Sequence, residues 1–143
     1  IPVLMEKIWN TIDKVKTHLS SDGYVTKRTT QSRTFYAFAV AETWGDIWVD
    51  YYHGPWIKYG TPFVLQFRER DIGKAYSRKV PEVVQNLLSA GFLKDDDLEF
   101  VYPIKITSVD LVSEVLSATR NKLKELRSIM PELGVNPGET RAE

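Results

Sequence analysis

The sequence contains no cysteine. A chain without thiols forms no disulfide bond, has no thiol nucleophile and offers no cysteine ligand to zinc or to an iron–sulfur cluster. The two histidines, His18 and His53, stand far apart in the sequence and make a poor set of metal ligands. We therefore expect no metal site and no cofactor, and we expect a cytoplasmic protein, because the lack of disulfides fits a reducing compartment.

The chain also lacks an excess of charge and a long apolar run. Its 19 basic and 19 acidic side chains give a formal net charge of zero, which argues against a partner that is recognised by bulk electrostatics. No apolar stretch approaches the roughly 20 residues that span a bilayer, so we expect no membrane partner. The 143 residues, 43% of them hydrophobic, fit one soluble globular domain.

Familiar catalytic motifs are missing too. The sequence has no glycine-rich phosphate loop, no HExxH helix motif and no GxSxG elbow. The acidic run at residues 95–97 lacks the glycine and the closing glutamate of a calcium loop, so we interpret residues 94–97 as a solvated turn. We predict no catalytic residue.

Hydrophobic periodicity predicts the fold. Apolar residues at helical spacing predict a first helix over residues 2–20 and a long last helix over residues 108–130. Between them we expect a short helix over residues 81–91 and five strands, at residues 24–30, 33–43, 46–53, 63–69 and 98–107. The order α-β-β-β-β-α-β-α favours a single α+β domain over residues 1–130. We expect a mostly antiparallel sheet of about five strands, with the two long helices on one face. Residues 131–143 have no periodicity and are predicted to be a disordered tail.

Aromatic side chains concentrate in residues 44–67, which hold three of the four tryptophans. Alternation in the strand at 46–53 puts Ile47, Val49 and Tyr51 on one face and sends Trp48, Asp50 and Tyr52 to the other. The strand at 63–69 likewise sets Phe63, Leu65 and Phe67 against Val64, Gln66 and Arg68. The connection over residues 53–62 is long for a hairpin, which indicates packing of its own or a site.

This aromatic segment has two interpretations. Its rings fill a core between sheet and helices, or some of them line a pocket that stacks on a planar ligand or a base. For the second interpretation the candidate ligand-binding residues are Asp50, Tyr52, His53, Trp56 and Tyr59. His53 has the pKa range of a general acid or base, but Asp50, three residues earlier, points to the opposite face of a regular strand.

A basic segment follows the fourth strand. Its candidate nucleic-acid-binding residues are Arg68, Arg70, Lys74, Arg78 and Lys79. They form a nucleic-acid-facing patch, or they are ordinary solvated charges that Glu69 and Asp71 partly neutralise. The zero net charge favours the second interpretation.

Several segments together resemble a group of bacterial domains that occur in proteins with PD-(D/E)XK nuclease-like regions. The segments are residues 47–52 (IWVDYY), Trp56, residues 60–63 (GTPF), residues 101–104 (VYPI) and the long last helix. The resemblance covers roughly residues 44–130 and implies an accessory or sensor role in DNA processing or defence. Such nucleases carry an aspartate on one strand and a (D/E)-x-Lys motif on the next, and the nearest equivalent here is Asp50 with Gln66 and Arg68.

These features leave three hypotheses about function. The first is a non-catalytic binding or sensor module whose partner is a small molecule or a protein, with nucleic acid as a further candidate. The second is a divergent PD-(D/E)XK-like nuclease that uses Asp50, Gln66 and Arg68. The third is a structural module that binds a second copy of itself as a homodimer.

Overall fold

The computed structural model describes residues 3–96 and 99–131. The described residues form one sheet of seven strands, and every strand pair in it is antiparallel. The order along the sheet is β1-β3-β4-β5-β7-β6, and β2 pairs with the first half of β3. The strands are β1 (Val25–Thr26), β2 (Thr30–Gln31), β3 (Phe35–Glu42), β4 (Gly45–Tyr52), β5 (Phe63–Phe67), β6 (Leu93–Asp95) and β7 (Glu99–Pro103).

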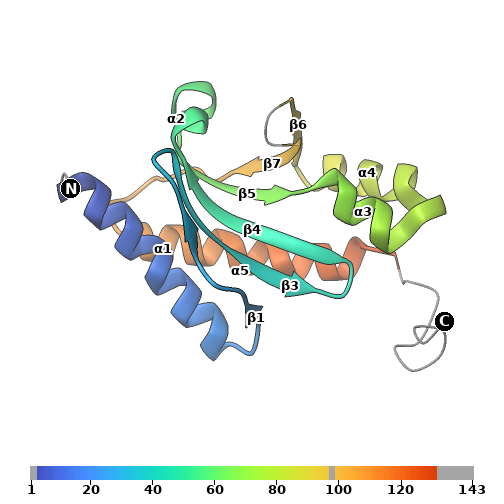
Figure 1. Cartoon of the computed structure of the whole chain (residues 1–143), viewed down its shortest axis with the longest axis horizontal. Coiled ribbons are helices and arrows are strands. Elements are labelled where there is room, and N and C mark those ends of the chain that lie inside the picture. The colour runs from blue at the N-terminus through green and yellow to red at the C-terminus, as the bar shows by residue number, and fades with distance from the viewer. Residues whose placement is uncertain (1–2, 97–98, 132–143) are drawn as a thin grey trace.

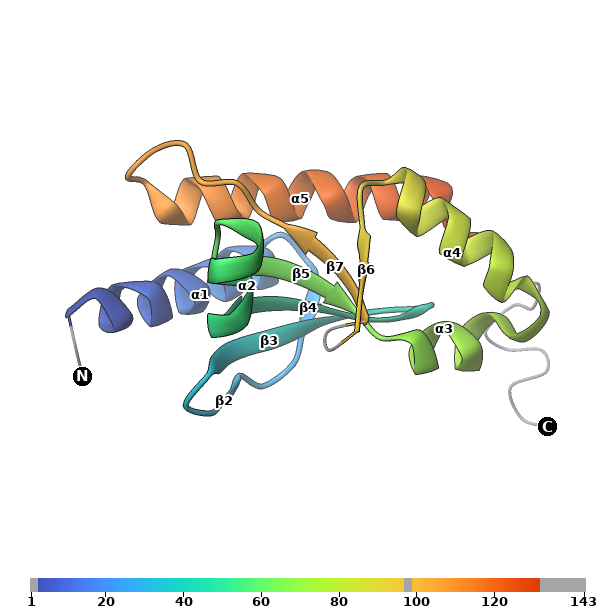
Figure 2. The same ribbon diagram turned by 90° about the horizontal axis from the view of Figure 1, so that it is seen from above.

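Two long helices pack against each other and against one face of this sheet, as Figures 1 and 2 show. They are α1 (Val3–Ser21) and α5 (Leu111–Ile129). Shorter helices connect the strands: α2 (His53–Tyr59), α3 (Glu69–Tyr76), the single 3-10 turn η1 (Ser77–Lys79) and α4 (Val80–Ser89). The α+β architecture, the antiparallel sheet and the placement of both long helices on one face were predicted from the sequence and are confirmed.

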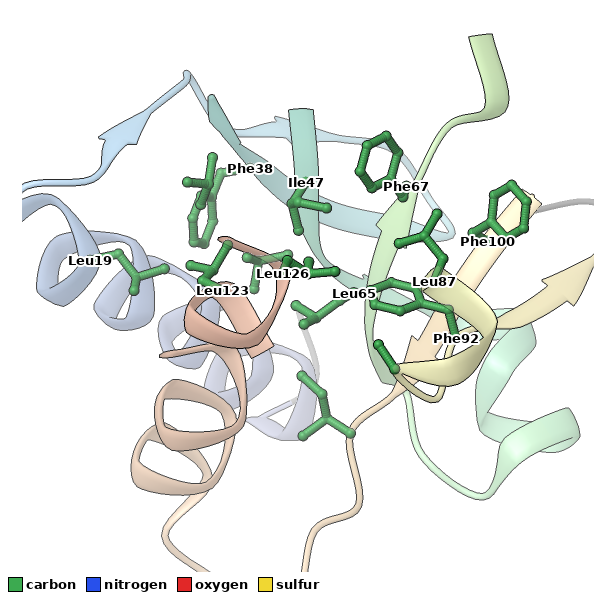
Figure 3. Close-up of a cluster of buried hydrophobic side chains, with 14 of the residues drawn as sticks. Leu19, Phe38, Ile47, Leu65, Phe67, Leu87, Phe92, Phe100, Leu123 and Leu126 are labelled. Carbon is green, nitrogen blue, oxygen red and sulfur yellow. The ribbon is translucent and has the colours of Figure 1, made fainter. Parts of the chain in front are cut away.

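The core lies between the sheet and these helices. Figure 3 shows Leu19 of α1 and Leu123 and Leu126 of α5 beside the strand residues Phe38, Ile47 and Leu65, all of them inaccessible to solvent. At the other end, Leu87 of α4 lies with Phe67, Phe92 and Phe100. Burial of this continuous apolar surface is the main term that holds the layers together. The helix-facing residues of β4 and β5 are those that the alternation predicted.

Local signals fix the ends of α5. The Asp110 carboxylate accepts hydrogen bonds from the backbone N–H and the hydroxyl of Ser113, which caps the first turn. Pro131 follows the last turn and cannot continue the helical hydrogen bonds. The helix is therefore slightly shorter than the predicted span of residues 108–130.

Two helices occur where the sequence predicted none. The connection over residues 53–62 contains α2, and the polar segment after β5 contains α3. In α3 only Ile72 and Tyr76 are buried. Ile72 and Tyr76 lie about one helical turn apart, so both face the core and anchor an otherwise charged helix to it.

The interpretation of residues 94–97 as a solvated turn is wrong for Asp95. This residue belongs to β6 and is buried. Its carboxylate accepts hydrogen bonds from the Lys58 ammonium and the Tyr59 hydroxyl of α2, so partners from another element replace solvent. With β6, and with the first predicted strand divided into β1 and β2, the sheet has seven strands in the described residues and not about five.

The two edges of the sheet are short. One edge is formed by β1 and β2, with 2 residues each, and the other by β6, with 3 residues. Among the described helices, none combines the length and the apolar character that crossing a bilayer requires. The predicted tail lies outside the described residues, except for Pro131.

Candidate functional site

The face of the sheet opposite the long helices carries a different set of side chains. Cross-strand register places Asp50 of β4 between Ala37 of β3 and Val64 of β5, and it places Trp48 opposite Gln66. Because side chains alternate along a strand, Trp48, Asp50 and Tyr52 share this face with Gln66. The small side chain of Ala37 beside Asp50 leaves a depression between the larger side chains.

The depression is a pocket of about 260 Å³. We call it the sheet-face pocket. Side chains from five strands, together with Arg68 directly after β5, line it: Thr30, Phe35, Ala37, Trp48, Asp50, Tyr52, Gln66, Arg68 and Glu99. It therefore combines flat aromatic surfaces with one basic and two acidic side chains.

Stacked side chains form two of its walls. The rings of Phe35 and Tyr52, neighbours across β3 and β4, stack with their centres 5.9 Å apart. The Arg68 guanidinium lies over the Trp48 ring, 5.0 Å from its centre, in a cation–π contact. These contacts restrain the aromatic side chains before any ligand arrives.

Asp50 is the unusual residue of the pocket. Only 4% of its surface is exposed, and no group in residues 3–96 or 99–131 donates a hydrogen bond to its buried Oδ1. Burial raises the pKa of the Asp50 carboxyl well above its ordinary value, and the positive charge of Arg68 opposes this shift. A buried carboxyl without a donor is costly, so Asp50 calls for an explanation beyond packing.

The five residues predicted to bind a ligand do not all meet in one place. Asp50 and Tyr52 line the sheet-face pocket, whereas His53, Trp56 and Tyr59 belong to α2 at the end of β4. His53 is exposed and begins this helix.

Two of the α2 residues contact different parts of the sheet. Trp56 keeps 38% of its surface exposed and meets the ring of Tyr51 edge to face, with the ring centres 6.4 Å apart. Tyr59 packs near Val64 and Val101 and donates its hydroxyl to Asp95. The loop aromatics thus brace α2 against the sheet.

Other lining residues were absent from the predicted ligand set. Phe35, Ala37, Thr30 and Glu99 come from β3, β2 and β7, and only the strand register brings them to Asp50. Gln66 was considered only in the partial nuclease motif, and Arg68 was considered in that motif and in the basic segment. Alternation in β4 and β5 was the signal that grouped Trp48, Asp50, Gln66 and Arg68 on one face.

The predicted basic segment is divided between the pocket and α3. Arg68 precedes α3 and lines the pocket. Arg70, Lys74 and Arg78 are exposed on α3 and η1, and their spacing of four residues places Arg70 and Lys74 on one side of the helix. Lys79 is exposed at the end of η1.

The described residues contain no group of three or more His, Cys, Asp or Glu side chains that could hold a metal ion.

Comparison with protein-family models, with curated proteins and with solved structures finds no match to this chain. A function for the chain therefore has to be inferred from the geometry and chemistry of the pocket itself.

Proposed function

We propose that this domain is a binding module and that the sheet-face pocket receives a small ligand or one group of a larger one. The observation that carries the proposal is the buried Oδ1 of Asp50, which has no hydrogen-bond donor in the described part of the chain. An unsatisfied buried acceptor costs roughly 1–3 kcal/mol. Such groups are rare in native structures, and a role in a site is one explanation for them; the Tyr76 hydroxyl is a second such group in the described residues but does not line the pocket.

The walls of the pocket support the same proposal. Trp48 and Tyr52 offer broad apolar ring surfaces on either side of Asp50 along β4. Pockets with aromatic walls and a few converging polar groups are the usual form of small-molecule sites. The resemblance noted in the sequence extends the proposal: the module serves as an accessory or sensor in DNA processing or defence.

A screen of single-ring fragments tests the proposal. Amide and indole NMR signals of the full chain are followed while each fragment is added. Binding at the pocket shifts the Trp48 indole and the amides near Asp50 and Gln66. If no fragment shifts these signals at millimolar concentration, the proposal is wrong.

Two tryptophan variants form a matched pair for this screen. Trp48→Leu removes a pocket wall, whereas Trp56→Leu removes a partly exposed ring of α2 outside the pocket. We expect only Trp48→Leu to abolish fragment binding. Loss of binding with Trp56→Leu alone would show that the fragments bind at α2 and not in the sheet-face pocket.

A second candidate function is the divergent nuclease, because Asp50, Gln66 and Arg68 line one pocket. Its weakness is chemical: Gln66 replaces a second carboxylate and Arg68 replaces the lysine of the motif. Cleavage of plasmid or single-stranded DNA with Mg²⁺ or Mn²⁺, abolished by Asp50→Asn, would support it. No cleavage with either metal would exclude the nuclease and leave the binding module as the proposed function.

A further inference from the structure

We infer that the sheet-face pocket takes a planar nitrogen heterocycle and pairs Asp50 with its amidine edge, a ring nitrogen beside an exocyclic amino group, as in cytosine or adenine. The inference rests on the proposed function and adds the chemical class of the ligand. The size of the pocket, its hydrogen-bonding groups and its charge each favour this class.

Size limits the ligand to one flat group. The pocket of about 260 Å³ lies just below the range of roughly 300–1,000 Å³ for sites that enclose drug-sized molecules. Trp48 and Tyr52 stand two residues before and after Asp50 on the same strand face, about 7 Å away on each side along the strand. A flat ring that stacks on either of these side chains can direct an edge, and not a face, toward Asp50.

Hydrogen bonding selects the kind of edge. A protonated carboxyl offers one O–H donor and one carbonyl acceptor, which match the ring nitrogen and the amino group of an amidine edge. After proton transfer, the carboxylate accepts two N–H bonds from the same edge in a stronger, charge-assisted pair. Because Oδ1 is buried in the unliganded chain, this pair requires the carboxyl to turn both oxygens toward the pocket. A lactam edge, with N–H beside C=O as in uracil, pairs with the protonated carboxyl alone. The amidine edge therefore matches Asp50 in both protonation states, and burial, which favours the neutral form, keeps the proton available.

Charge in the pocket favours no ion of either sign. The charged side chains that line the pocket are Asp50, Arg68 and Glu99. With Asp50 protonated, the positive Arg68 and the negative Glu99 balance, so the pocket has no net charge. Each of these two side chains attracts ions of one sign and repels ions of the other, so a charged ligand gains no net attraction. A neutral heterocycle avoids the cost of burying a charge.

The heterocycle has two sources, a free nucleoside or a base of a single strand. Helix α3 begins directly after Arg68, and its exposed Arg70 and Lys74 lie on one side of the helix. If the base belongs to a strand, these cations are the candidates for contact with its phosphates. Both sources present the same edge to Asp50, so the experiment includes both.

The experiment measures the affinity of the full chain for two pairs of nucleosides by NMR titration. Cytidine and adenosine carry the amidine edge, whereas uridine and inosine are near-isosteric partners with a lactam edge. We expect cytidine and adenosine to bind at least about tenfold more tightly than their partners, because the charge-assisted pair is open to them alone. A deoxycytidine pentanucleotide forms the strand arm: tighter binding than cytidine, reduced by Lys74→Glu, identifies a strand as the source, and equal affinity identifies the free nucleoside.

Two variants at Asp50 complete the design. Asp50→Asn keeps one donor and one acceptor but transfers no proton, so both members of each pair bind and the preference falls to near onefold. Asp50→Leu removes the hydrogen bonds and weakens all four nucleosides. A folded-state NMR spectrum confirms that each variant retains the sheet.

The outcomes separate the inference from the proposed function. Equal binding of cytidine and uridine by the natural chain overturns the inference and leaves the binding module standing. Binding of single-ring fragments at Trp48 with no binding of any nucleoside does the same. No binding of fragments or nucleosides overturns both.

Discussion

The guanidinium carbon of Arg68 lies 5.0 Å from the centre of the Trp48 ring, at the wall of the pocket that holds Asp50. The stack fixes a positive charge near a carboxyl that burial tends to neutralise. The charge of Arg68 and the burial of Asp50 therefore act on that carboxyl in opposite directions.

The first prediction concerns this opposition. Arg68→Met keeps a long side chain over Trp48 but removes the charge, so we expect the pKa of Asp50 to rise further. A titration followed by the side-chain carbonyl carbon signal of Asp50 measures it. Arg70→Met, which removes an exposed charge from the next helix, is the control and should leave the titration unchanged. An unchanged Asp50 titration in Arg68→Met would show that Arg68 does not act on this carboxyl.

The second prediction is a pH-dependent gain in stability for Asp50→Asn. Burial raises the folded-state pKa of Asp50 above its unfolded value of about 3.9. Between these two pKa values the folded state binds more protons, so the contribution of Asp50 to stability falls as pH rises. The asparagine does not titrate. We expect the variant to be more stable than the natural chain at pH 7 and nearly equal to it below pH 4.

Urea denaturation at several pH values checks this gain. The other charged groups that line the pocket are Arg68 and Glu99, while the β3 neighbour Ala37 carries no charge. Both charged groups remain in the variant, so they do not account for a difference in the pH profile. A constant difference between the two proteins from pH 3 to pH 7 would contradict the assignment to Asp50.

The third prediction contrasts two glycines. Gly91 follows α4 with φ of +93°, and a Cβ there would lie 3.2 Å from Cε1 of Tyr102. Gly73 lies inside α3, where a Cβ would meet nothing within 4 Å. We expect Gly91→Ala to lower the free energy of unfolding by about 1–2 kcal/mol and Gly73→Ala to raise it by about 0.5–1 kcal/mol. Thermal and urea unfolding measure both, and the same sign for the two variants would refute the prediction.

The fourth prediction concerns Lys122, which keeps only 8% of its surface exposed. Its ammonium donates hydrogen bonds to the carbonyl oxygen of Ala90 and to Glu125, and it lies 4.2 Å from the centre of the Tyr102 ring. Lys122→Met removes the donor that joins α5 to the end of α4. We expect a loss of about 1–3 kcal/mol in the free energy of unfolding.

Lys124→Met provides the matched control, because Lys124 is exposed on the same helix. It should change the free energy of unfolding by less than about 0.5 kcal/mol. If both lysine variants behave alike in urea denaturation, the contact with Ala90 contributes nothing measurable.

The elements with strong periodicity were predictable. The apolar stripes of α1 and α5 and the alternation in β4 and β5 reflect burial of one face, so local sequence was sufficient. Helix α2 was missed because Gly54 and Pro55 disfavour an isolated helix. What anchors α2 is non-local: Lys58 and Tyr59 reach Asp95, more than 35 positions away.

The candidate site was predictable in part for the same reason. Alternation assigned Trp48, Asp50 and Tyr52 to one face of β4. In the same way it assigned Gln66 and Arg68 to one face of the neighbouring predicted strand. It could not supply Phe35 or Glu99, because their place depends on strand register across the sheet. Nor could it show that α2 turns Trp56 toward Tyr51 and away from the pocket. The sequence thus predicted the pocket residues of β4 and β5 but not those of β2, β3 and β7.

The shortness of β1 and β6 has a consequence for how the protein behaves in concentrated solution. A strand at the edge of a sheet offers unpaired backbone groups on which another chain can build a fibril. Here the edge strands have only 2 residues each on one side, in β1 and β2, and 3 on the other, in β6, too few to template a stable added strand. The domain should therefore stay free of thioflavin-positive aggregates on long storage at high concentration, although it exposes aromatic side chains.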